Sequence, residues 1–122
     1  MIGFAVASAA AVLGAGVHTL VGSRRVVAPL LKARDLTPPS RWLMFLCWHA
    51  VSVLLAVLAA GFAWAAWSAQ ARDIGLMLTA LAAALALLTL YVAVRAGFRP
   101  WRLPPFVLFS LMAAAGGWSL LT

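Results

Sequence analysis

The sequence predicts an all-α, polytopic membrane protein: a single domain over residues 1–122, built as a bundle of four transmembrane helices, N-out/C-out. Of its 122 residues, 66% are hydrophobic, and the mean hydropathy is +1.09, values typical of polytopic membrane proteins and above those of soluble domains. Its few charged residues lie in short segments between four long apolar runs. Because one crossing takes about 20 residues, four crossings leave almost nothing for a soluble domain.

The first two helices are expected over residues 2–22 and 42–67. The first run is free of charged residues, and its basic residues follow it. A signal peptide carries them before the apolar stretch, so a retained helix is expected. Ser40 is suited to cap the second helix, and Pro38 with Pro39 ends whatever precedes it.

The last two helices are expected over residues 74–94 and 106–122. Asp73 is suited to cap the third helix. The fourth follows Pro104 and Pro105 and is short, so local thinning of the bilayer would accommodate it.

The loops predict the orientation. Loops 23–41 and 95–105 carry eight of the nine basic residues, and Arg72 alone lies between the second and third runs. Because Lys and Arg collect on the cytoplasmic side, we expect these two loops inside, in a bacterial cytoplasmic (inner) membrane. The formal charge of +7 therefore reflects topology. Nucleic acid is not an expected partner, since the basic residues neither cluster on a helix face nor alternate with stacking aromatics.

Loop 23–41 has a pattern of its own, in which apolar residues alternate with basic ones around Pro29. This pattern predicts either a short interfacial helix lying on the inner leaflet or a solvated loop.

Two histidines lie inside the apolar runs. His18 belongs to a stripe of small residues, which lets a neighbouring helix approach closely, so it is expected on a packed face. His49 shares a helix face with Phe45, Ser52 and Ala56 and is also expected to face protein. Counting from the cytoplasmic ends puts His18 about 6 Å deep, His49 about 10 to 12 Å deep, and Tyr91 about 6 Å deep. The stripe consists of Gly3, Ala7, Ala10, Gly14, His18 and Gly22.

Several uses of these polar groups stay open. In the structural use, each imidazole bonds to Thr19, Ser52, Tyr91 or a backbone carbonyl and contributes about 1 kcal/mol to helix association. In the second, His18 and His49 ligate a b-type haem whose propionates contact loop arginines.

The third use of the pair is a metal site for copper or zinc. Cys47 points about 200° away from His49 on a helix and cannot easily join it.

A further alternative is a binding pocket for a quinone or lipid head group in the cytoplasmic half of the bundle. It would be lined by Tyr91 and Arg95. Arg24 and Arg25 are further candidates for contacts with propionates or head groups.

Two function classes are disfavoured. A proton-coupled exporter needs a carboxylate within the membrane, and the only acids, Asp35 and Asp73, lie in loops. A hydrolase needs a nucleophile paired with a base, or a carboxylate pair, and neither occurs in a recognisable motif. We therefore expect a small integral membrane protein of a non-enzymatic type that acts through helix packing as a homo-oligomer or as an accessory subunit of a membrane complex.

Two motifs carry a resemblance. They are His18-Thr19-Leu20-Val21-Gly22-Ser23-Arg24-Arg25, followed by Pro29-Leu30, and Trp48-His49-Ala50-Val51-Ser52. The chain thus resembles small, functionally uncharacterised four-helix proteins of the bacterial inner membrane with a His-Ser/Thr-x-x-Gly-x-Arg-Arg, Pro-Leu and Trp-His-x-x-Ser signature. Ser23 departs from that pattern, in which the position is often acidic. The resemblance implies four helices and importance for His18 and His49, and it implies no activity.

Overall fold

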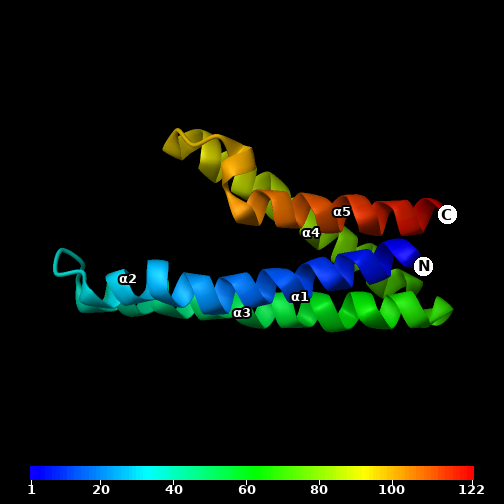
Figure 1. Cartoon of the computed structure of the whole chain (residues 1–122), viewed down its shortest axis with the longest axis horizontal. Helices are drawn as coiled ribbons and strands as arrows, with labels where there is room; N and C mark the ends of the chain where they lie inside the picture. The colour runs from blue at the N-terminus through cyan, green and yellow to red at the C-terminus, as the bar shows by residue number, and fades with distance from the viewer.

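The computed structural model describes all 122 residues and is entirely helical, without a strand. Four of its helices are long and apolar enough to cross a membrane, which confirms the expected all-α class and the number of such helices. Both chain ends lie at one end of the bundle, and the turns around residues 33–37 and 97–103 lie at the other (Figure 1).

The first helix continues well beyond its predicted end. α1 (Ile2–Gly22), a π-helical turn η1 (Ser23–Val27) and α2 (Ala28–Lys32) follow without a break and make one helix of 31 residues. The predicted loop 23–41 is therefore wrong over most of its length. α2 prolongs α1 and is not a separate interfacial helix (Figure 1).

The loop was predicted because the uncharged run ends at Gly22 and basic residues follow it, and Pro29 lies within this segment. A proline inside an α-helix lacks the N–H and its ring collides with the carbonyl four residues earlier. The π-helical turn lies directly before Pro29, and in it the Ala28 N–H bonds to the carbonyl of Ser23, five residues back. This wider turn shifts the hydrogen-bond register, so the helix passes the proline and ends only at Lys32.

α3 (Pro38–Trp67) begins four residues earlier than expected and has 30 residues. Pro38 and Pro39 open the helix and do not merely end the preceding segment, because proline fits the first helical turn, where its missing N–H has no partner to lose. Thr37, not Ser40, is the N-cap residue. At about 1.5 Å per residue the helix is about 45 Å long, which exceeds the hydrocarbon core.

The last two helices agree with prediction to within two residues at each end. A short 3₁₀ turn η2 (Ala69–Ala71) leads into α4 (Arg72–Ala96), and η3 (Pro100–Arg102) leads into α5 (Pro104–Leu121). α4 ends at Gly97, whose φ of 75° is left-handed. Glycine adopts this conformation without strain, and such a residue commonly ends a helix.

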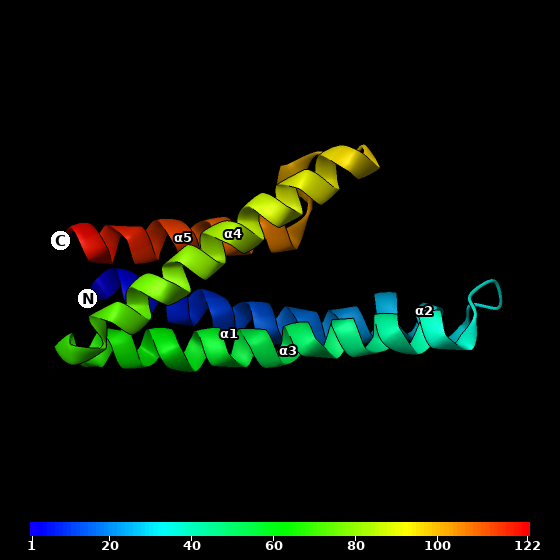
Figure 2. The same ribbon diagram turned by 180° about the vertical axis from the view of Figure 1, so that it is seen from behind.

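The helices pack in the order α3, α1, α5, α4 around the bundle. α1 lies between α3 and α5, and α4 packs mainly on α5. α4 crosses the other helices obliquely from the α3–α4 turn, so that its C-terminal end lies apart from α1 and α3 (Figure 2).

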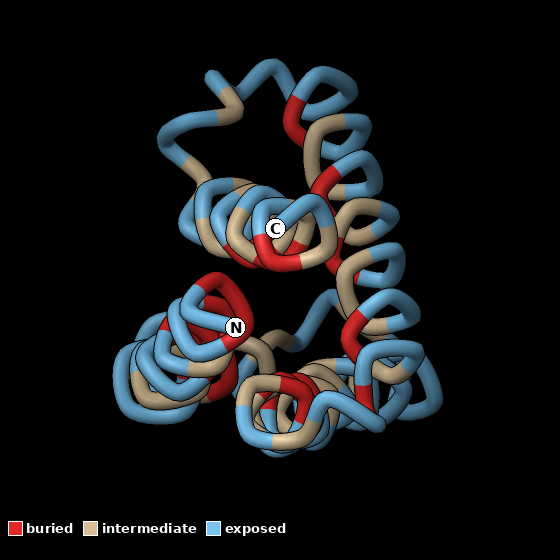
Figure 3. Tube along the Cα trace, turned by 90° about the vertical axis from the view of Figure 1, so that its right-hand side faces the viewer, coloured by how far each residue is buried: buried red, intermediate tan, exposed pale blue.

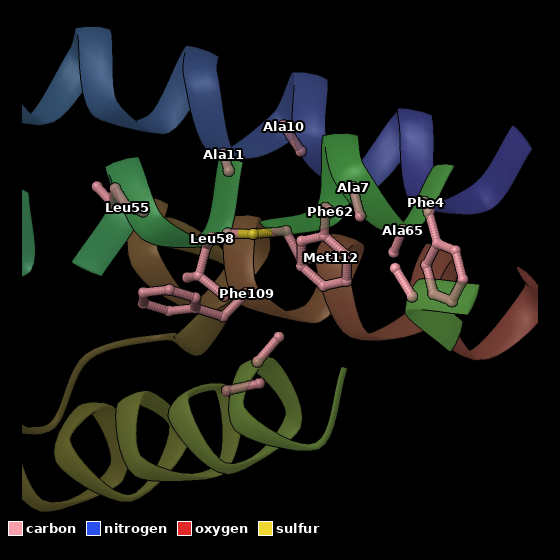
Figure 4. Close-up of a cluster of buried hydrophobic side chains, with 13 residues drawn as sticks. Phe4, Ala7, Ala10, Ala11, Leu55, Leu58, Phe62, Ala65, Phe109 and Met112 are labelled. Carbon is pink, nitrogen blue, oxygen red and sulfur yellow. The ribbon is translucent and has the colours of Figure 1, made fainter. Parts of the chain in front are cut away.

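The core lies in the half of the bundle that holds both termini. Buried positions are on the sides of the helices that face one another (Figure 3). Its large members include Phe4 and Phe62, whose stacked rings lie 6.1 Å apart (Figure 4). By contrast, α3 has no buried residue before Leu55. The core residues are Phe4, Ala7, Ala10, Ala11, Leu55, Leu58, Phe62, Ala65, Ala71, Ala82, Ala86, Phe109 and Met112.

Candidate functional site

His18 on α1 is bound to Trp48 on α3 in two ways. Its imidazole stacks on the indole, with ring centroids 4.0 Å apart and an interplanar angle of 16°. Its Nε2 also lies 2.9 Å from the backbone oxygen of Trp48. Because a carbonyl only accepts hydrogen bonds, Nε2 carries the proton and donates it. His18 is half-buried and lies on a packed face, as its small-residue stripe predicts.

Gly22 allows the Trp48 indole to lie against α1. Gly22 lies one turn beyond His18 on the same helix face and is buried. A Cβ atom added at Gly22 would come within 2.2 Å of the indole, so any larger residue would displace the ring. The two sequence motifs are thus brought side by side, with His18 and Gly22 on one helix and Trp48 on the other.

His49 has different surroundings. It follows Trp48 along α3 and is therefore turned by about 100° around the helix axis. Its ring makes an edge contact with Phe45, at 4.3 Å between centroids, and the side chain is exposed. The expectation that His49 faces protein is not met within this chain, because Trp48 occupies the face of α3 that contacts α1.

Neighbouring hydroxyl groups do not bind either histidine. Thr19 Oγ1 donates to the Ala15 carbonyl of its own helix at 2.8 Å. The Ser52 hydroxyl, one turn beyond Trp48, is buried and has no hydrogen-bond partner. Of the partners expected for His18, the backbone carbonyl is the one it uses.

The other predicted site residues lie in two separate places. Arg24 and Arg25 are exposed on η1, while Tyr91 and Arg95 are exposed near the end of α4. These segments lie apart at the same end of the bundle (Figures 1 and 2). The structure does not bring them together with His18 around one cavity.

Haem or metal ligation can be tested against this geometry. Bis-histidine ligation requires one nitrogen of each imidazole to point at the same iron. His18 Nε2 points at the Trp48 carbonyl, so ligation through that atom would first break this hydrogen bond. No three side chains of the His, Cys, Asp or Glu type come together as a metal site, and Cys47 is exposed.

Comparison with known proteins finds no relative of this chain. No family model, curated protein or solved structure matches this chain.

Six cavities open on the surface. One of about 310 Å³ lies between α1 and α3 near the termini. Another, of about 380 Å³, lies at the α4–α5 turn and is lined by Gly97, Phe98, Arg99, Arg102 and Leu103. Neither Tyr91 nor Arg95 lines either of these two. The cavity at the α4–α5 turn was not predicted from the sequence. A signal was present, because two turn-forming residues, Gly97 and Pro100, lie beside Arg99 and Arg102.

Proposed function

We propose that this chain is a small integral membrane protein, not an enzyme, that works as one part of a membrane assembly. In this proposal its four helices cross a bacterial cytoplasmic membrane with both termini outside, because eight of the nine basic residues lie at the opposite end of the bundle. The partner is a second copy of the chain or another subunit. The observation that carries the proposal is the exposed imidazole of His49.

His49 lies about 16 Å along α3 from Pro38, at a depth where the helix would be surrounded by hydrocarbon. Ionisable side chains at that depth almost always face protein or a water-filled cavity. His49 is exposed, with Phe45 as its aromatic neighbour, whereas His18 has its hydrogen-bond acceptor inside the chain. A second membrane helix that covers His49 would supply the missing acceptor.

The residues that follow on the same face of α3 favour such a helix. Ala56 and Ala60 lie two and three turns beyond His49, and both are exposed. Small residues let two backbones approach closely, which is what drives helix association in lipid. Leu43, which lies about 120° from His49 around the helix axis, is 61% exposed and suits contact with lipid.

Site-specific photo-crosslinking in bacterial membranes tests this proposal. A photoreactive residue replaces His49 in one variant and Leu43, on a different face of the same helix, in the other. We expect a discrete protein adduct from position 49, either a dimer of the chain or a larger product, and no protein adduct from position 43. If both positions give a protein adduct, or neither does, an assembly through this face of α3 is not supported.

A further inference from the structure

Free positive charge is concentrated at one end of the molecule. Arg72, the only basic residue at the end that holds the termini, donates a hydrogen bond to the Leu120 carbonyl. At the opposite end, Arg41 donates to the Ala33 carbonyl at 2.7 Å. Arg99 and Arg102 at the α4–α5 turn make no such bond within the chain, so their guanidinium groups are free to bind a ligand.

The turn places these two arginines on the same side. Arg99 is the N-cap of the 3₁₀ turn η3 and Arg102 is its last residue, and the Arg102 N–H bonds to the Arg99 carbonyl at 2.9 Å. Both arginines line the cavity of about 380 Å³ between the end of α4 and the start of α5.

We propose that this cavity binds a phosphate group. A guanidinium is planar and offers paired N–H donors that match phosphate oxygens in a bidentate manner. The cavity has a volume of about 380 Å³ and opens to the surface, so it is large enough for a phosphate group that enters from outside.

The position of the cavity indicates where such a phosphate comes from. Phe98 lines it and is 60% exposed, and Trp101, in the same turn, is 66% exposed. Exposed aromatic rings at helix ends are typical of the membrane interface, where lipid head groups lie. The phosphate of an anionic lipid and free inorganic phosphate present the same oxygens, and the test separates the two. The inference does not involve His49 or its assembly.

The test uses the full chain in uncharged detergent micelles. Short-chain phosphatidic acid is titrated, and native mass spectrometry counts the molecules bound per chain. We expect one saturable site. The R99Q/R102Q double variant should bind phosphatidic acid at least about tenfold more weakly, because the loss of even one charge-assisted hydrogen bond lowers the affinity by about that factor.

The K32Q/R34Q double variant is the matched control. It removes the same charge from the same end of the bundle but outside the cavity, so we expect a change of about twofold or less, as for exposed charges that act at a distance. Arg99→Lys combined with Arg102→Lys keeps the charge and should still weaken binding, because an ammonium lacks the paired donors. This variant also covers the case in which the glutamine variant fails to fold.

Inorganic phosphate is the competing probe. If millimolar phosphate displaces the lipid, the site takes the free anion; if it does not, the site takes the phosphate of the lipid head group. Either result supports the phosphate site. The proposal is overturned if the two glutamine variants lose affinity equally, or if neither probe binds the unmodified chain.

Discussion

The imidazole of His18 lies flat against the indole of Trp48, and its Nε2 donates to the backbone carbonyl of the same tryptophan at 2.9 Å. The side chain of His18 on α1 therefore contacts both the indole and the backbone carbonyl of Trp48 on α3. This contact lies in the half of the bundle where α3 has no buried residue of its own. It connects the two helices beyond the end of the core.

Replacing His18 with alanine should destabilise the bundle. The variant loses an interhelical hydrogen bond and an aromatic stacking contact, which together are worth about 1 to 2 kcal/mol. Unfolding in mixed micelles with increasing sodium dodecyl sulfate, followed by circular dichroism, measures the difference. His49→Ala is the control and should leave the unfolding midpoint of the isolated chain unchanged. A larger loss for His49→Ala than for His18→Ala would contradict this assignment.

Gly22 and Gly16 form a matched pair on α1. A Cβ atom at Gly22 would lie 2.2 Å from the Trp48 ring, while one at Gly16 would meet nothing within 4 Å. We expect Gly22→Ala to lower the free energy of unfolding by about 1 to 3 kcal/mol through overpacking. Gly16→Ala should be neutral or stabilising by up to about 1 kcal/mol, because alanine is the better helix former. The same unfolding assay compares them, and equal effects would show that Trp48 does not lie against Gly22.

A second glycine pair tests the α4–α5 contact. A Cβ atom at Gly116 would lie 2.2 Å from Thr79 Oγ1, whereas one at the adjacent Gly117 would be in open space. Gly116→Ala should therefore destabilise by about 1 to 3 kcal/mol, and Gly117→Ala should not. If Thr79→Ala is added to Gly116→Ala, the smaller side chain should restore part of the loss, as measured in a double-mutant cycle.

Haem binding through both histidines is tested by an absorption spectrum. Because His18 Nε2 is bonded to Trp48, we expect no Soret band that depends on His18 and His49 when the chain is produced with haem supplied. A Soret band that disappears in the variant carrying His18→Ala with His49→Ala would contradict this and would favour a b-type haem. A band that survives in that variant would come from another site.

The number of helices followed from hydropathy because every long apolar run is bounded by charged or turn-forming residues. The third and fourth helices agree within two residues, since Gly97, Pro104 and Pro105 act locally on the backbone. The end of the first helix was predicted wrongly, because the basic residues that begin at Arg24 were taken to start a loop. The helix continues past them and past Pro29 through a π-helical turn, and a hydrogen-bond register of this kind leaves no clear trace in the sequence.

The direction in which a histidine points could be predicted for one helix and not for the other. On α1 the stripe of glycines and alanines around His18 marks a face for close packing, and His18 lies on it. On α3 the two adjacent candidates, Trp48 and His49, differ by about 100° around the axis. Only one of them can face α1, and the choice depends on which ring fits the surface of that helix.

The amino-acid sequence by itself determined an all-helical chain with four helices long and apolar enough to cross a membrane, because apolar composition and helix-ending residues act over a few neighbouring positions. The tertiary structure alone decided that Gly22 receives the indole of Trp48, that His18 uses the carbonyl of that tryptophan, and that His49 is left exposed. It also decided that Arg99 and Arg102 share a cavity. These relationships depend on how helices rotate and diverge when their side chains pack, and packing joins residues that are far apart along the chain.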